Sequence, residues 1–268
     1  MTRKQVVWVF CLFLLFPLVT SAQSASTRRD PEAVALLSRS LRVITNGVPI
    51  HDVTLTGTAR SIAGSDDEKG AVTAKALATG ETRVDYSYAS GVRSESRRMS
   101  PTGVIENWSG PDGSVHAVVP HNTAPLSPWF FPGALLQTLE QRTDTAVEYV
   151  GKETRNGRAV EHVTIAGQVP AYHHPQVMLT LLQKSARVEL YLDGANGFPV
   201  AIAYNTHPDK NLAKDIPVEI RFSDYRPVEG VQVPHQIQKY LNHARVLDVK
   251  VSTTILNSGL SASSLGLQ

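Results

Sequence analysis

The sequence predicts a mainly β protein, with some helix, that forms one domain around a single antiparallel sheet. Apolar and polar residues alternate with a period of two in at least six segments, and Gly- or Asn-containing turns separate several of them. Three segments replace this pattern with helical spacing. We find no linker, low-complexity tract or fixed-period repeat, which favours one domain.

The first residues have the three-part layout of a secretory signal peptide. Arg3 and Lys4 precede an almost wholly apolar run over 6–19, and small side chains follow up to Ala22. The run is shorter than the ~20 residues that span a bilayer as a helix. We predict a signal peptide over 1–22, with an uncleaved anchor as the alternative, and a disordered leader over 23–30.

Removal of this segment leaves a chain with no net charge and no thiol. The sequence has 26 Lys and Arg against 24 Asp and Glu, and Arg3 and Lys4 account for the excess. The one cysteine, Cys11, lies in the same segment. A neutral chain gives no support for nucleic-acid binding. We therefore predict no nucleic-acid partner, no disulfide, and no stable membrane insertion after signal cleavage.

An N-terminal helix precedes the strands. Asp30 is a good N-cap, Pro31 suits the first helical position, and apolar residues recur at helical spacing up to Ile44. The Asn-Gly pair at 46–47 then predicts the helix end.

The strands fall into three groups, and two helical segments separate the groups. We expect the acidic run over 66–68 to form a hairpin loop, and the breaks at 125–142 and 172–185 to contain helices. Asn-Gly pairs at 156–157 and 196–197 predict tight turns between strands. The total is eleven to thirteen strands, expected over 53–58, 71–78, 82–89, 92–99, 104–108, 115–119, 146–151, 158–165, 187–192, 200–204, 216–223, 231–241 and 247–255.

The sequence lacks the common catalytic motifs. It contains no Walker-type phosphate loop, no dinucleotide-binding glycine motif, no G-x-S-x-G elbow and no H-E-x-x-H. We expect His173 and His174 to lie in a polar loop and His207 in a solvated turn. The sequence therefore predicts no metal site and no cofactor. A histidine-based hydrolase site near His116 and His121 is kept as an alternative.

One aromatic block is the best candidate for a ligand site. Three consecutive aromatic residues lie between Pro128 and Pro132, and three leucines on one helical face follow. The block is either a plug that closes one end of the sheet or the wall of an apolar ligand cavity. The candidate ligand-binding residues are Trp108, Trp129, Phe130, Phe131, Leu135, Leu136 and Leu139.

The C-terminal third resembles a known family. A Tyr-Leu-Asp turn leads into Gly-Phe-Pro over 191–199, and an F-S-D-Y-R-P-V segment precedes G-V-Q-V-P over 222–234. This pattern is similar to exported proteins related to the bacterial outer-membrane lipoprotein carriers (LolA/LolB-like). The resemblance implies an incomplete antiparallel barrel of about eleven strands with helices in its concave face. It places the domain at 31–260 and a C-terminal tail at 261–268.

The same resemblance implies a binding function. Members of the family carry lipoprotein acyl chains or bind other hydrophobic ligands. We therefore expect an exported, periplasmic or secreted, non-enzymatic protein that holds a lipid-like ligand. The alternatives are the hydrolase and a structural or interaction protein of the cell envelope; the sequence identifies no protein partner.

Overall fold

We describe a computed structural model, which covers residues 28–101, 103–123, 126–167 and 176–267. The predicted signal peptide and His173 and His174 lie outside these residues. Within them, no helix is long and apolar enough to cross a membrane.

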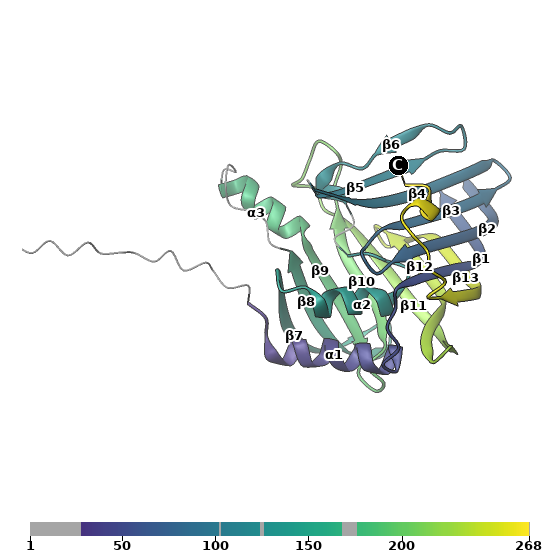
Figure 1. The fold of residues 1–268 in the computed structure, drawn as a ribbon. Helices are drawn as coiled ribbons and strands as arrows, with labels where there is room; N and C mark the ends of the chain where they lie inside the picture. The colour runs from purple at the N-terminus through teal and green to yellow at the C-terminus, as the bar shows by residue number, and fades with distance from the viewer. Residues whose placement is uncertain (1–27, 102, 124–125, 168–175, 268) are drawn as a thin grey trace, which may run out of the picture.

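All the described strands belong to one open antiparallel sheet, as predicted (Figure 1). The sheet has 13 strands in the order β6-β5-β4-β3-β2-β1-β13-β12-β11-β10-β9-β8-β7. This number lies within the eleven to thirteen expected from the alternation, whereas the number of about eleven that the resemblance implies is too low. The strands are β1 (Asp52–Ala63), β2 (Asp66–Leu77), β3 (Thr82–Tyr88), β4 (Gly91–Ser100), β5 (Gly103–Ser109), β6 (Val115–Ala117), β7 (Thr145–Arg155), β8 (Arg158–Gly167), β9 (Arg187–Asp193), β10 (Pro199–Thr206), β11 (Ile216–Val228), β12 (Val231–Leu241) and β13 (Ala244–Leu256).

Two local features of the sheet differ from a regular meander. The acidic run, expected in a loop, belongs to β2, where Asp67 forms a salt bridge with Arg60 of β1. The β1–β13 register shifts at Gly57, where an added Cβ would lie 2.0 Å from the Lys250 carbonyl oxygen. A glycine at such a close approach lets the strands bend past each other without a steric clash.

Two helices cover the inner face of the sheet at one end. Asp30 caps α1 (Pro31–Thr45) by accepting a hydrogen bond from the Glu32 amide at 3.0 Å, as the sequence predicts. α1 packs on α2 (Pro132–Gln141), and both contact β12. Gly133 allows this approach, because a Cβ there would lie 2.9 Å from Ile50.

The third helix does not share this position. α3 (Gln176–Ser185) confirms the second predicted helical segment over its described part, but it contacts β10 and the short 3-10 helix η1 (Pro120–Asn122). Figure 1 shows it beyond the strand ends, away from α1 and α2. Val177 of this helix is 75% exposed.

Both ends of the described chain are held by hydrogen bonds. Residues 28–30, assigned to the leader from the sequence, pair with β7 through the backbone of Val147. At the other end, Asp52 accepts hydrogen bonds from the amides of Ser258, Gly259 and Leu260. Although burial raises the pKa of Asp52, these bonds lower it below its usual value. The 3-10 helix η2 (Ser263–Leu265) then packs against the domain, with Leu265 buried.

Candidate functional site: a cavity on the concave face

A cavity of about 980 Å³ opens on the inner face of the sheet. β3, β4 and β5 line one side, and β10 to β13 line the other. Ligand cavities of roughly 300–1,000 Å³ are typical for small molecules. The cavity is therefore large enough to hold a ligand.

Apolar side chains form much of its wall. Val84 of β3, Val218 of β11 and Leu247 of β13 are each less than 10% exposed and line it from opposite sides. They come from strands far apart in the sequence, and the curvature of the sheet brings them to one space. Such a surface favours the apolar part of a ligand.

The β4 side of the cavity is charged. Arg93, Glu95 and Arg97 occur at every second position of β4, so they share one face of the strand. Arg97 forms a salt bridge with Glu106 of β5, and both side chains are less than 15% exposed. Arg93 forms a salt bridge with Glu68 of β2. These two cations are neutralised by carboxylates of the neighbouring strands.

Lys239 of β12 carries another charge into the cavity. Its ammonium group lies 5.4 Å from the centre of the Trp129 ring, a cation–π contact. Burial alone would lower the pKa of Lys239, but the charges of Glu95, Tyr204 and Glu106 raise it above its ordinary value. Lys239 is therefore positively charged at neutral pH.

Two tyrosines of β3 complete the polar side. The rings of Tyr86 and Tyr88 stack with centroids 6.0 Å apart, and the residues are 5% and 8% exposed. Their hydroxyl oxygens are buried and make no hydrogen bond of normal geometry among the described residues. Burial raises the pKa of both hydroxyls. Both are neutral and able to donate.

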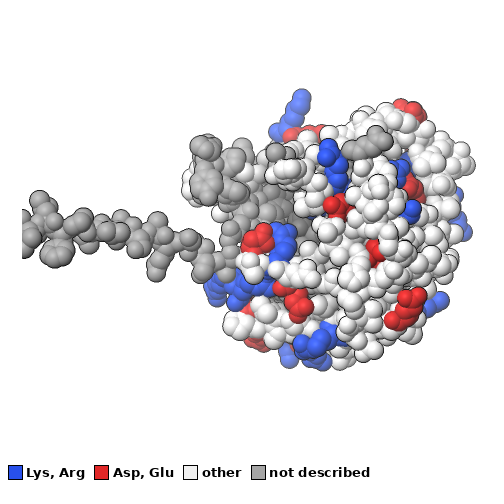
Figure 2. Space-filling view, in the orientation of Figure 1, with Lys and Arg blue, Asp and Glu red and all other residues white. Residues whose placement is uncertain are grey.

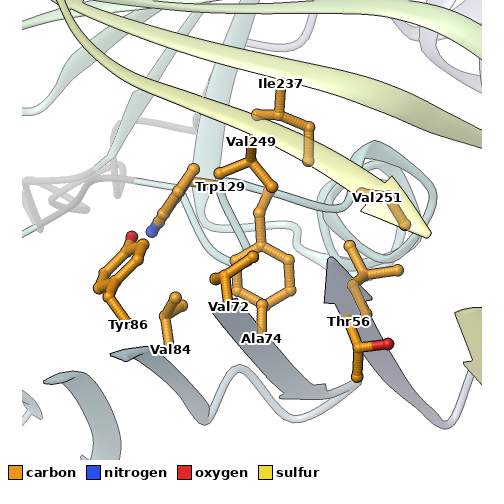
Figure 3. Close-up of a pocket in the computed structure, with 11 residues that line it drawn as sticks. Thr56, Val72, Ala74, Val84, Tyr86, Trp129, Ile237, Val249 and Val251 are labelled. Carbon is orange, nitrogen blue, oxygen red and sulfur yellow. The ribbon is translucent and has the colours of Figure 1, made fainter. Parts of the chain in front are cut away.

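Trp129 separates this cavity from a second, very small one of about 10 Å³ (Figure 3). Trp129, Tyr86 and Val84 line both spaces. Figure 3 shows the Trp129 ring beside the Tyr86 ring, with Val84 below them and Val72 and Ala74 of β2 to their right. The Trp129 side chain is thus a partition between a tightly packed core and the open cavity.

The predicted ligand residues separate into three groups. Trp108 is 47% exposed and lines the large cavity, as Trp129 does; its ring stacks on His116 at 4.2 Å. Phe130 lines only the small cavity. The remaining four line neither cavity and are at most 2% exposed, in the core that α1 and α2 close; they are Phe131, Leu135, Leu136 and Leu139.

Sequence reasoning missed most of the polar wall. The alternation of Arg93, Glu95 and Arg97 on one strand face was visible, but β4 alone does not reveal which face is internal. Lys239 and Tyr86 looked like ordinary residues of amphipathic strands. Charged residues at every second position of one strand, next to a strand with apolar residues on the same face, are the sequence signal that could have predicted this polar wall.

The two histidines of the hydrolase alternative do not form a catalytic triad. Ser114 donates a 2.6 Å hydrogen bond to Asp112, and His116 Nε2 lies 3.0 Å from the same hydroxyl. In a triad the carboxylate orients the histidine, which accepts the serine proton. Here the Ser114 hydroxyl donates to the Asp112 carboxylate, whereas in a triad it would donate to the histidine.

His121 lies in a different cluster. Its ring faces His207 with centroids 6.2 Å apart, and His207 Nε2 lies 3.2 Å from Asp215. His207 is 3% exposed, so the expectation of a solvated turn is wrong; Asn122 binds the His207 backbone and holds it in place. Among the described residues, no group of three His, Cys, Asp or Glu side chains is arranged to bind a metal.

Comparison with known proteins supports the fold. No protein-family model and no curated protein sequence matches the chain. Among the solved structures that resemble it are the following three. One is a domain named for outer membrane lipoprotein sorting from Vibrio parahaemolyticus (TM-score 0.53, 9% identity, 85% of this chain and 95% of that chain). The second is a DUF1329 family protein from Desulfovibrio piger (TM-score 0.53, 11% identity, 90% of this chain and 100% of that chain). The third is a LolA superfamily protein from Nitrosomonas europaea (TM-score 0.51, 14% identity, 86% of this chain and 96% of that chain).

The protein therefore has a LolA-like fold: one open antiparallel sheet with helices on its inner face. The resemblance predicted from the C-terminal motifs is confirmed at the level of the fold. At these sequence identities the similarity shows only that the folds are alike. Any argument about function has to start from the cavity of this protein.

Proposed function

We propose that this is an exported, non-enzymatic binding protein that holds the apolar part of a lipid-like ligand in the 980 Å³ cavity. The observation that carries the proposal is the cavity itself, with apolar side chains on both sides and Trp129 at its base. The names of two similar structures, which refer to lipoprotein sorting and to the LolA superfamily, agree with it.

In this proposal Trp129 and Trp108 contact the ligand directly. Trp129 offers one ring face to the cavity, and Trp108 lies on the wall formed by β5. The buried leucines of α2 hold the aromatic segment against α1 and keep Trp129 in place. The aromatic block thus combines the two roles that the sequence left open, a plug and a ligand wall.

The binding proposal is tested by filling the cavity. Leu247→Trp places a large ring in it, whereas Ile255→Trp makes a similar change on the same strand at a residue that is 49% exposed. We expect a lipid in organic extracts of the purified wild-type protein, detected by mass spectrometry. We also expect Leu247→Trp, but not Ile255→Trp, to abolish uptake of a fluorescent fatty-acid probe. No extracted lipid together with no probe uptake by the wild type would refute the proposal.

The export part of the proposal rests on the layout of residues 1–22 and has its own test. Intact-mass analysis of protein from the extracytoplasmic fraction should give a chain that begins near Gln23. A membrane-bound chain that retains its first 22 residues would contradict export by a cleaved signal peptide.

A further inference from the structure

The cavity contains two opposite charges that are left over after local pairing. Arg93 and Arg97 each form a salt bridge with a neighbouring carboxylate. Lys239 and Glu95 also line the cavity, yet neither takes part in a salt bridge among the described residues. Lys239 has only its contact with Trp129 and longer-range attraction to its acidic neighbours. A cation and an anion that attract each other without forming a salt bridge thus border the same space.

Two buried tyrosine hydroxyls lie beside these charges. The Tyr86 hydroxyl interacts with Glu95 and the Tyr88 hydroxyl with Ser61, although neither contact has the geometry of a normal hydrogen bond. The Glu95 carboxylate raises the pKa of the Tyr86 hydroxyl, which is therefore neutral beside it. The polar side of the cavity thus offers a positive charge and a negative charge to whatever occupies it.

This inference rests on the proposed function and names the class of ligand. We infer that the ligand is an amphiphile with a zwitterionic headgroup. Its acidic oxygens bind the Lys239 ammonium, and its cationic group lies against Glu95. Its chain extends toward Val84, Val218 and Leu247.

Other headgroup classes leave a charge without compensation. A fatty-acid carboxylate would pair with Lys239 but would repel the Glu95 carboxylate. A cationic headgroup would pair with Glu95 but would repel the Lys239 ammonium. A neutral headgroup would displace water from both charged groups without replacing the hydrogen bonds that the water made. Buried charges without partners are strongly unfavourable.

The test uses four probes that share a twelve-carbon chain and differ in headgroup. They are dodecylphosphocholine (zwitterionic), laurate (anionic), dodecyltrimethylammonium (cationic) and glycerol monolaurate (neutral). Each is titrated as a monomer into the purified full chain, and binding is followed by calorimetry. We expect the wild type to bind dodecylphosphocholine about tenfold more tightly than the other three probes, the effect of one hydrogen bond to a charged group.

Two variants assign the charges. Lys239→Met should shift the preference toward dodecyltrimethylammonium, and Glu95→Gln should shift it toward laurate. Lys250→Met is the matched control, because Lys250 is exposed on β13 and does not line the cavity. Thermal melts verify that each variant is folded, and the double exchange Lys239→Glu with Glu95→Lys should restore the preference for dodecylphosphocholine.

Three outcomes are decisive against the inference. Equal affinity of the wild type for all four probes overturns the headgroup assignment and leaves the proposed lipid-binding function standing. A preference that neither Lys239→Met nor Glu95→Gln alters has the same consequence. Binding of none of the four probes overturns the proposed function and this inference with it.

Discussion

The two halves of the sheet bury their inner faces in different ways. On β8 to β11, inner residues such as Val163, Leu190 and Ile220 are fully buried in the core that includes α1 and α2. On β3 to β5 the corresponding face carries stacked tyrosines, charged side chains and Trp108, and it borders the cavity. Antiparallel pairing of neighbouring strands runs through both halves.

The difference shows that the helices packed on a sheet face determine whether its side chains are apolar or polar. Where a helix excludes water, apolar side chains are the stable choice, because buried charges are costly. Where no helix packs, a wall of paired charges and aromatic rings remains compatible with solvent or a ligand. Figure 2 shows Lys and Arg interspersed with Asp and Glu on the face of the molecule that it displays.

The largest effect is expected in the covered half. Phe131 is 0% exposed, so Phe131→Ala should lower the free energy of unfolding by about 3–5 kcal/mol, because it leaves a cavity in a packed core. Urea denaturation measures the loss, and Val150→Ala at an exposed site is the control. A loss below about 1 kcal/mol would show that this segment is a mobile lid rather than core.

A smaller loss of stability is expected at the boundary between the halves. Trp129→Ala should cost about 1–3 kcal/mol of unfolding free energy, because one side of the ring already faces a cavity. The same change should weaken fatty-acid probe binding about tenfold, whereas Phe131→Ala should leave it unchanged. Equal probe affinity of Trp129→Ala, Phe131→Ala and the wild type would show that Trp129 is a core residue that does not contact the ligand.

A pH dependence is expected on the outer face of the covered half. Burial raises the pKa of Glu189, but hydrogen bonds from His162, Arg187 and Thr164 outweigh it and lower the pKa to about 2. The folded-state pKa lies below the unfolded value, so this stabilisation is present above about pH 4.5 and disappears as the pH falls toward 2.

Glu189→Gln measures that contribution. At pH 6 the variant should be less stable than the wild type by about 2 kcal/mol, and the difference should vanish near pH 2. Urea titrations at a series of pH values provide the data. A difference that stays constant with pH would show that the carboxylate charge has no part in the stabilisation.

The smallest change in stability is expected in the open half. Trp108 is 47% exposed, so Trp108→Ala should change the unfolding free energy by less than about 1 kcal/mol. It should nevertheless weaken probe binding several-fold, because the ring lines the cavity. Unaltered probe affinity of this variant would show that Trp108 does not contact the ligand. The melting temperature of the variant is the control for an intact fold.

Much of the fold was predictable because its signals are local. Asp30 and Pro31 begin α1 where capping rules place them, and the Asn-Gly pairs turn β7 into β8 and β9 into β10. The acidic run of β2 was misplaced because its side chains suit a loop by composition. Its strand geometry comes from pairing with β1.

The candidate site was only partly predictable. The cluster around Trp129 stood out from its aromatic composition, and the structure places Trp129 on the cavity wall. Phe131 and the leucines after it have equally apolar side chains, yet they line no described cavity. Amino-acid composition does not distinguish an apolar residue that packs against a helix from one that lines a cavity.

The sequence by itself determined the mainly β class, the single sheet and the helix that begins at Pro31, since each depends on periodicity, caps or turns within a few residues. Only the tertiary structure decided that Glu95 of β4 and Lys239 of β12 face one cavity. They are far apart in the sequence and meet because the sheet curves and the strand register selects which face turns inward. A shift of one residue in either strand would move the charge to the outer surface, and no local signal specifies that choice.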